Sequence, residues 1–333
     1  MRGYRNYRGR NSPLKRLAVI GMVAVLLLAA AYLFISEFKE YDSDGNAHIV
    51  LPWQKEDPAA DGSGDRDADI DIVYDEPEDL LPSVQAVEYS VSEARQGESA
   101  LRAKLGEGNA AALWLKRPDG CLRYHSDAAG PALCFTDGLT GAELQRFTAG
   151  DTYTIARLSC MKDNAAPMRD MAGLALTQEN GYVWYGSAGE HYLDLAKSAA
   201  REYLIALVLE LADAGFDEVL MSDLAYPADG VQSSISTAED RTAAVTAFLK
   251  ELKEAVKDSG VKLSLELSES AALAGSSAAE GISLAEQLPL VNRVYVQTEH
   301  ADAVRDAVGA VRADMSVVII GGEGTNRYIP QTN

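Results

Sequence analysis

Two acidic residues stand where catalysis is common in α/β proteins. Asp223 follows the apolar segment 219–221, and Glu266 lies near the end of a second apolar segment, 261–267. A carboxylate at the carboxyl end of a parallel strand is where α/β barrels keep their chemistry. One protonated and one ionised carboxyl group could act there as a general acid and as a nucleophile or base. The structural alternative is that Asp223 caps the turn before Pro227.

The segments around these carboxylates alternate between strand and helix patterns. Helix 237–258 is the clearest, because Val245, Phe248, Leu249 and Leu252 lie on one apolar face. Strands are predicted at 84–90, 110–115, 152–159, 216–222, 261–267, 291–297 and 316–320. Alternating strands and helices imply a parallel sheet with right-handed crossovers.

Seven such units over about 250 residues are close to the size of a (β/α)8 barrel. We therefore expect an α/β, TIM-barrel-like domain at 82–333 that is incomplete, because only thirteen residues without a helical period follow Ile320. A strand from residues 48–51 or 70–74 could contribute an eighth member. An open, doubly wound sheet is the alternative, but no glycine-rich phosphate loop follows the first strand.

The N-terminal residues have the pattern of a membrane anchor. Residues 1–16 contain six basic side chains and no acidic one, and residues 17–35 are nineteen uncharged residues. That length just crosses a bilayer, and the positive-inside rule places the basic arm in the cytoplasm. We expect a single-pass cell-membrane protein with an extracytoplasmic C-terminal domain. A cleaved signal peptide, with alanines at 29–31, is the alternative.

The remainder of the chain is strongly acidic. The formal net charge is −20 although the N-terminal arm is basic, so nucleic acid and anionic lipid surfaces are poor partners. Residues 36–81 are rich in Asp, Glu, Gly and Pro and are predicted to form a disordered linker. Their acids, beginning at Asp67, partly match a calcium loop, but Ile72 occupies the position that requires glycine.

The cysteines and histidines indicate no metal site and no cofactor. Cys121, Cys134 and Cys160 permit one disulfide, and the pair Cys121–Cys134 is favoured because both lie in one loop region. The four histidines are scattered, so a metal or Ser-His site has no local support.

Three segments resemble one protein family. They are YTIARLSCMKD at 153–163, LKRPDGCLRYHS at 115–126 and the long segment 203–230, whose core is GFDE-x4-D-x3-P-x2-G. Together they resemble the DUF4015 family of predicted glycoside hydrolases, over residues 82 to 270. The chain departs from the family pattern at Leu115, where the family has aspartate, and at Ala225, where it has arginine. Val294, Tyr295 and Val296 replace a Met-Tyr-Pro pattern.

The resemblance implies an extracytoplasmic TIM barrel that hydrolyses a polysaccharide with two carboxyl groups. Asp223 and Glu266 match those roles. Lys116 and Arg157 end predicted strands and could hold one carboxylate ionised. The aromatic side chains that could stack on sugars are Trp184, Tyr185, Tyr226 and Tyr295. Because the departures fall at strand ends, two alternatives stay open: a non-catalytic barrel that binds envelope glycan or a protein, and a structural tethered module.

Overall fold

The computed structural model describes residues 39–41, 47–49, 81–96, 98–130, 134–236 and 240–331. The chain divides into two units, Met1–Glu76 and Pro77–Asn333. In the first unit, strands β1 (Lys39–Tyr41) and β2 (Ala47–Ile49) pair antiparallel within the predicted linker. The predicted membrane span 17–35 lies outside the described residues. Among the helices that are described, none is both long and apolar enough to cross a bilayer.

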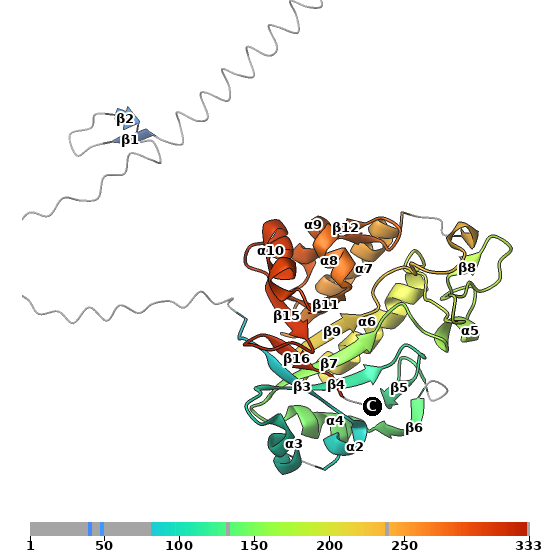
Figure 1. Ribbon diagram of the computed structural model, residues 1–333, viewed down its shortest axis with the longest axis horizontal. Coiled ribbons are helices and arrows are strands. Elements are labelled where there is room, and N and C mark those ends of the chain that lie inside the picture. The colour runs from blue at the N-terminus through green and yellow to red at the C-terminus, as the bar shows by residue number, and fades with distance from the viewer. Residues whose placement is uncertain are drawn as a thin grey trace, which may run out of the picture. The chain divides into compact units, whose positions relative to one another are not determined.

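The second unit is built on a closed barrel of eight parallel strands (Figure 1). The strands are β3 (Gln85–Tyr89), β4 (Ala110–Lys116), β7 (Tyr153–Ser159), β9 (Glu218–Ser222), β11 (Lys262–Leu267), β14 (Arg293–Gln297), β15 (Ser316–Ile320) and β16 (Arg327–Ile329). Each pairs in parallel with the next along the chain. The last strand, β16, pairs in parallel with the first, β3, and so closes the barrel.

The expectation of an incomplete barrel was wrong. The eighth strand is β16, in which Tyr328 is the partner of Ile320 on one side and of Ala86 on the other. It has only three residues and follows β15 without an intervening helix, so it lacks both the length and the periodicity that mark a β/α unit in sequence. Of the two linker segments that were candidates, residues 47–49 form β2 and pair with β1, and residues 70–74 lie outside the described residues.

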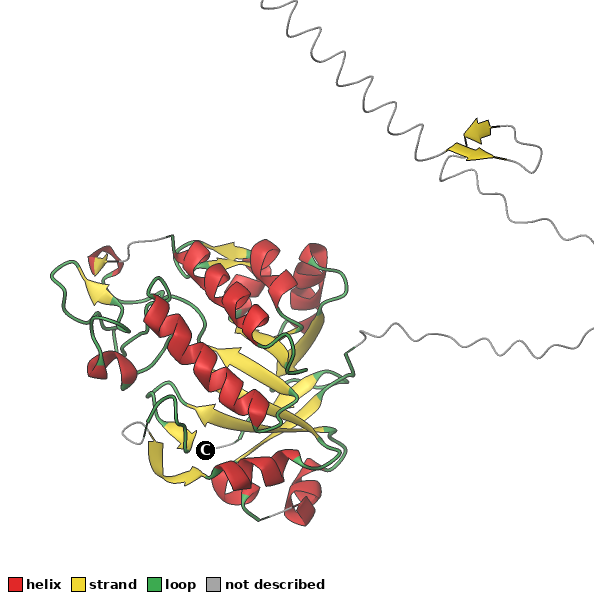
Figure 2. Ribbon diagram, turned by 180° about the vertical axis from the view of Figure 1, so that it is seen from behind, coloured by secondary structure: helices red, strands yellow, loops and turns green. Residues whose placement is uncertain are grey.

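Helices cover the outside of the barrel, as the view from behind shows (Figure 2). The helices of the second unit are α2 (Val91–Ala94), α3 (Glu98–Leu105), α4 (Gly141–Thr148), α5 (Ala166–Arg169), α6 (Ser198–Asp213), α7 (Arg241–Ala255), α8 (Glu269–Ala274), α9 (Leu284–Gln287) and α10 (Ala301–Val311). Helix α7 begins where the Asp240 side chain accepts hydrogen bonds from the backbone N–H groups of Thr242 and Ala243. Its buried face includes Val245, Phe248 and Leu249, as the apolar spacing predicts.

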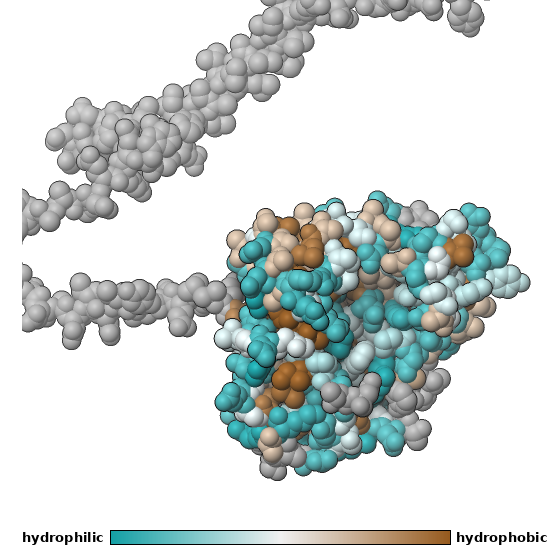
Figure 3. All heavy atoms as spheres, viewed as in Figure 1, coloured by the Kyte–Doolittle hydropathy of each residue, from teal (hydrophilic) through white to brown (hydrophobic). Residues whose placement is uncertain are grey.

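Several short strands and 3₁₀ turns lie outside the eight barrel strands. Strands β5 (Leu122–Tyr124) and β6 (Cys134–Leu139) extend the sheet from β4. Two short strand pairs lie in loops, β8 (Thr177–Gln178) with β10 (Ile235–Ser236) and β12 (Ser276–Ser277) with β13 (Ile282–Ser283), and so do the 3₁₀ turns Gln232–Ser234 and Leu288–Leu290. The face of the barrel unit in Figure 3 is mostly hydrophilic, with apolar residues in small areas, as is usual for a surface in contact with water.

The expected Cys121–Cys134 disulfide is not formed. Cys121 and Cys160 both carry free thiols. The residue registered opposite Cys134 is Leu122 rather than Cys121, so the two cysteines are not direct partners across β5 and β6. Burial raises the pKa of the Cys160 thiol to about 12, which leaves it protonated and unreactive at neutral pH.

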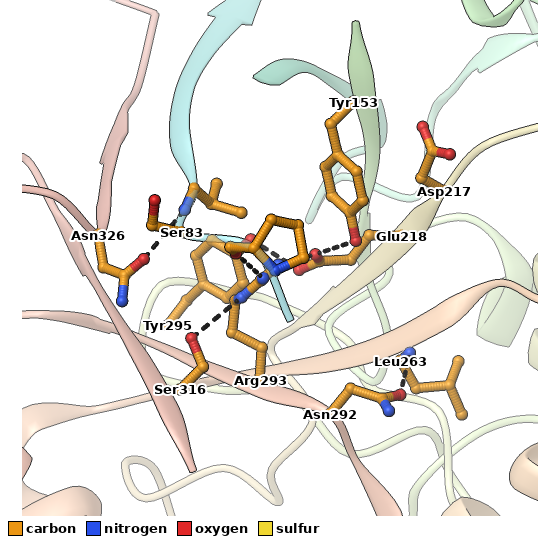
Figure 4. Close-up of polar contacts among 12 residues, drawn as sticks. Ser83, Tyr153, Asp217, Glu218, Leu263, Asn292, Arg293, Tyr295, Ser316 and Asn326 are labelled. Atoms are coloured by element: carbon orange, nitrogen blue, oxygen red, sulfur yellow. Dashed lines mark hydrogen bonds and ion pairs between the residues drawn. The ribbon is translucent and has the colours of Figure 1, made fainter. Parts of the chain in front are cut away.

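A polar network fills the barrel at the amino ends of its strands (Figure 4). Arg293, the first residue of β14, forms an ion pair with Glu218, the first residue of β9, and both side chains are fully buried. The hydroxyls of Tyr295 and Tyr153 donate to Glu218 at 2.6 and 2.9 Å, and Arg293 also donates to the Pro82 carbonyl at 2.8 Å. A buried charge is tolerated only when it is paired and hydrogen-bonded. Arg293 and Glu218 meet that condition, so their network can fill the barrel interior at this end.

Candidate active site

A pocket of about 410 Å³ opens at the carboxyl ends of β9 and β11. Asp223 and Glu266 both line it, together with Glu269, Glu280 and Gln297. Strands β9 and β11 are neighbours in the barrel, so the two predicted carboxylates reach one pocket from adjacent strands. This is the end of a β/α barrel at which loops and strand termini build active sites.

Asp223 has a strained backbone. It follows the last residue of β9, and its φ of 50° is the single positive value outside glycine in the described residues. Such conformations cost on the order of 1–3 kcal/mol and cluster at functional sites. Ser159 Oγ lies 2.6 Å from Asp223 Oδ2 and donates a hydrogen bond to it, and the Asp223 carbonyl accepts from Met161 N at 3.1 Å. The carboxylate is therefore held in one orientation.

Glu266 is largely buried and paired with a cation. Its side chain keeps 21% of its surface exposed, and Arg157 Nη2 lies 2.7 Å from Oε2 and 2.9 Å from Oε1. Burial raises the pKa of the Glu266 carboxyl, with Arg157 acting in the opposite direction and the charges of Asp223 and Glu88 adding to the rise. A carboxyl group with a raised pKa retains its proton to higher pH, as a general acid requires.

Arg157 contacts a second carboxylate. Its Nη1 lies 3.6 Å from Oε2 of Glu88, which is buried at the end of β3. The same Glu88 oxygen accepts a hydrogen bond of 2.6 Å from the Tyr328 hydroxyl on β16. The Arg157 guanidinium also stacks on the Trp114 ring, 4.2 Å from its centroid. Side chains from four strands, β3, β4, β11 and β16, thus fix the position of the Arg157 guanidinium.

Lys116 lies away from the pocket. It is fully buried, its Nζ lies 2.8 Å from Asp163 Oδ2, and it donates to the Ser159 carbonyl at 2.7 Å. Asp163 Oδ1 in turn accepts from the backbone N–H groups of Ala165 and Ala166. The predicted pairing of Lys116 with Asp223 or Glu266 was therefore wrong, because the loop after β7 supplies a nearer carboxylate.

Three of the four predicted sugar-stacking aromatics are buried, whereas Tyr185 is exposed and does not line the pocket. Trp184 packs against Tyr192 and donates to the Val231 carbonyl at 3.2 Å. Tyr226 donates to Asp194 at 3.0 Å, and Tyr295 belongs to the network at the opposite end of the barrel. Each has its polar atom bonded within the protein, so none of the three faces the pocket.

Three neighbours of the carboxylates were missed by sequence reasoning: Ser159, Glu88 and Tyr328. A signal existed for Glu88, because it continues the series Val84, Ala86 and so places a charge on the barrel-facing side of a strand. Tyr328 lies on the unrecognised eighth strand. Ser159 ends β7 in register with Ser222, the residue before Asp223, which only the strand pairing reveals.

A closed eight-stranded parallel barrel with a carboxylate-lined pocket at the carboxyl ends of its strands is a TIM barrel with a candidate hydrolytic site. The DUF4015 family, described as "Putative glycosyl hydrolase domain", matches residues 89–283, more than half of the chain. The chain belongs to this family, which confirms the resemblance found in the sequence.

The chain is similar to several solved structures, of which the first named here, with a TM-score above 0.5, supports the fold. The glycoside hydrolase domain of PgaB (BpsB) from Bordetella bronchiseptica is 13% identical with a TM-score of 0.51, over 75% of this chain and 94% of that one. A hypothetical protein from Ruminiclostridium thermocellum is 24% identical, over 54% and 96% of the chains, with a TM-score of 0.45. The glycoside hydrolase domain of PelA from Pseudomonas aeruginosa is 18% identical, over 71% and 82%, with a TM-score of 0.40. No curated protein matches the chain by sequence.

Proposed function

We propose that this protein is a glycoside hydrolase that cleaves an extracytoplasmic polysaccharide by a two-carboxylate mechanism. The observation that carries the proposal is the shared pocket, into which adjacent strands bring Asp223 and Glu266. Glycosidic hydrolysis needs one carboxyl group that donates a proton and one that acts as a base or nucleophile. Family membership supports the same reaction class.

The different surroundings of the two carboxylates support a division of roles. Glu266 is the candidate general acid, because burial raises the pKa of its carboxyl and it can protonate the leaving glycosidic oxygen. Asp223 is the candidate nucleophile or base, oriented by Ser159. As nucleophile it would bond to the anomeric carbon while the protonated oxygen leaves, and water would then release the sugar with Glu266 acting as base.

One observation favours a non-catalytic, glycan-binding barrel as the second candidate. The 2.7 Å ion pair with Arg157 stabilises the charged form of Glu266, and a permanently ionised Glu266 could not donate a proton. A pocket with oriented carboxylates and amides can still bind sugar hydroxyls. The two candidates differ in turnover and agree on binding.

We further propose that the domain acts outside the cytoplasm, tethered by the uncharged segment 17–35. The basic residues before that segment support this topology. An extracytoplasmic position would bring the pocket to cell-envelope or secreted polysaccharide.

The test is a hydrolysis and binding screen of the full-length protein, in detergent, on a panel of purified polysaccharides, with reducing ends as the readout. Turnover that is lost in both Asp223→Asn and Glu266→Gln supports the hydrolase. Binding by the wild-type protein without new reducing ends, unchanged in Asp223→Asn, supports the binding barrel instead. The matched control is Glu286→Gln, because Glu286 lies outside the pocket lining.

A further inference from the structure

We propose that Glu88, held by Tyr328, shares Arg157 with Glu266 and thereby allows Glu266 to serve as the proton donor. The inference rests on the proposed hydrolase function and assigns positioning roles to two residues outside the carboxylate pair. Neither residue lines the pocket; Glu88 would act on Glu266 through Arg157 as well as through its own charge, and Tyr328 would act through Glu88.

The geometry places one cation between two carboxylates. Arg157 points from β7 toward Glu266 on β11, at 2.7 Å, and toward Glu88 on β3, at 3.6 Å. Trp114 limits the movement of the guanidinium toward either carboxylate, because the central guanidinium carbon lies over the indole ring, 4.2 Å from its centroid. A single fixed positive charge therefore faces two buried acids.

The charge balance of this cluster favours binding one proton. Glu88 and Glu266 share one guanidinium, Asp223 adds its negative charge near Glu266, and a buried excess of negative charge is unfavourable. Glu88 is buried and accepts a hydrogen bond of 2.6 Å from Tyr328, which holds it beside Arg157. Glu266 is the member of the pair that lines the pocket, and burial together with the charge of Asp223 raises the pKa of its carboxyl.

The competition explains how an ion-paired acid can act as a proton donor. If Glu88 were absent, Arg157 would have Glu266 as its only carboxylate partner within 4 Å among the described residues. Glu266 would then lose its proton at lower pH. The charged groups that act on Glu266 are Arg157 from β7, Glu88 from β3 and Asp223 after β9. Glu269 and Glu280 line the same pocket, and Tyr328 from β16 acts through Glu88.

The test is a side-chain titration that needs no substrate. Full-length protein labelled with ¹³C at the glutamate carboxyl carbon is titrated by NMR, and the Glu266 signal is assigned by its loss in Glu266→Gln. In Glu88→Gln we expect the Glu266 midpoint to fall by about one pH unit, a tenfold change in proton affinity. Tyr328→Phe should shift the midpoint in the same direction by less, since Glu88 without the hydroxyl that holds it is less firmly placed beside Arg157 and competes less for it.

The matched control is Tyr295→Phe, which removes an equivalent buried bond between a tyrosine hydroxyl and a glutamate at the other end of the barrel. It should leave the Glu266 midpoint unchanged. If Glu88→Gln does not fold, the Glu266 midpoint measured in Tyr328→Phe decides the test. An unchanged or raised midpoint in a folded variant overturns the inference, whatever the hydrolysis screen shows.

A substrate, once found, gives a second readout. The alkaline limb of the kcat profile against pH should move down with the midpoint in Glu88→Gln, while KM at low pH stays the same. A shifted midpoint in a protein that hydrolyses no polysaccharide supports the sharing of Arg157 and overturns the proposed function, so the two failures are distinguishable.

Discussion

Ser159 Oγ donates a hydrogen bond of 2.6 Å to Asp223 Oδ2. Ser159 is the last residue of β7, and Asp223 comes directly after the last residue of the neighbouring strand β9. The backbone of Asp223 has a φ of 50°. An aspartate in the left-handed region is sterically unfavourable by roughly 1–2 kcal/mol. Its presence at the mouth of a pocket indicates that the orientation of this carboxylate matters more than local backbone stability.

Asp223→Asn should abolish hydrolysis with little loss of stability. The amide oxygen can still accept the Ser159 hydrogen bond, and asparagine tolerates a positive φ well, but it cannot act as a nucleophile or base. We expect turnover to fall by several orders of magnitude and the free energy of unfolding, measured in urea, to stay within about 0.5 kcal/mol of wild type. Ser159→Ala is the variant for comparison, because it removes the hydroxyl that donates to Asp223 and leaves the Asp223 carboxylate in place. Retained turnover in Asp223→Asn would exclude a catalytic role.

Glu266→Gln should change the pH dependence of stability. The raised pKa of Glu266 means that the folded state binds this proton more tightly than the unfolded state. The resulting stabilisation is present below the unfolded pKa of about 4.3 and is lost as the pH rises through the folded pKa. Relative to Glu266→Gln, the wild type should therefore become less stable between acid and neutral pH. Denaturant unfolding at several pH values measures this, and a difference that does not vary with pH would contradict the assignment.

Lys116→Met should destabilise the fold strongly. It would leave Asp163 buried without its cation, and breaking a buried pair of this kind costs about 3–5 kcal/mol. Lys162→Met is the matched control, because the pair of Lys162 with Glu190 is partly exposed and is worth about 0–1 kcal/mol. Equal unfolding midpoints for the two variants would show that the Lys116 pair is not structural.

Tyr295→Phe should reduce stability and leave sugar binding intact. The lost hydroxyl donates to the buried Glu218, and a hydrogen bond to a charged group contributes about 1.5–3 kcal/mol. The network lies at the amino ends of the strands (Figure 4), away from the pocket. Thermal unfolding and polysaccharide binding, measured on the same preparation, test both parts. Weaker binding at full stability would place Tyr295 in the sugar site after all.

A reporter fused after Asn333 should be active only outside the cytoplasm. The basic arm at 1–16 and the uncharged run at 17–35 predict an N-terminus inside and a C-terminal domain outside. Paired fusions of alkaline phosphatase, which needs an oxidising compartment, and of a cytoplasm-dependent fluorescent protein distinguish the two sides. Replacing the arginines at positions 2, 5, 8 and 10 by glutamine should weaken the preference.

Much of the barrel follows from the sequence alone. Apolar strand segments separated by one-faced helices predicted seven of the eight strands, because side-chain periodicity records which faces are buried. The positions of Asp223 and Glu266 at the carboxyl ends of neighbouring strands followed from the same pattern, since parallel strands bring those ends to one edge.

The tertiary structure alone decided how the barrel closes and which side chains meet. Strand β16 has three residues and no periodicity of its own, and it is a strand because β15 and β3 supply partners on both sides. That closure brings Tyr328 to Glu88, 240 positions earlier in the chain. The same packing buries Lys116, Trp184 and Tyr295 beside their polar partners. Local sequence determines which residues tend to be buried, whereas the partner of a buried polar group depends on contacts between distant segments.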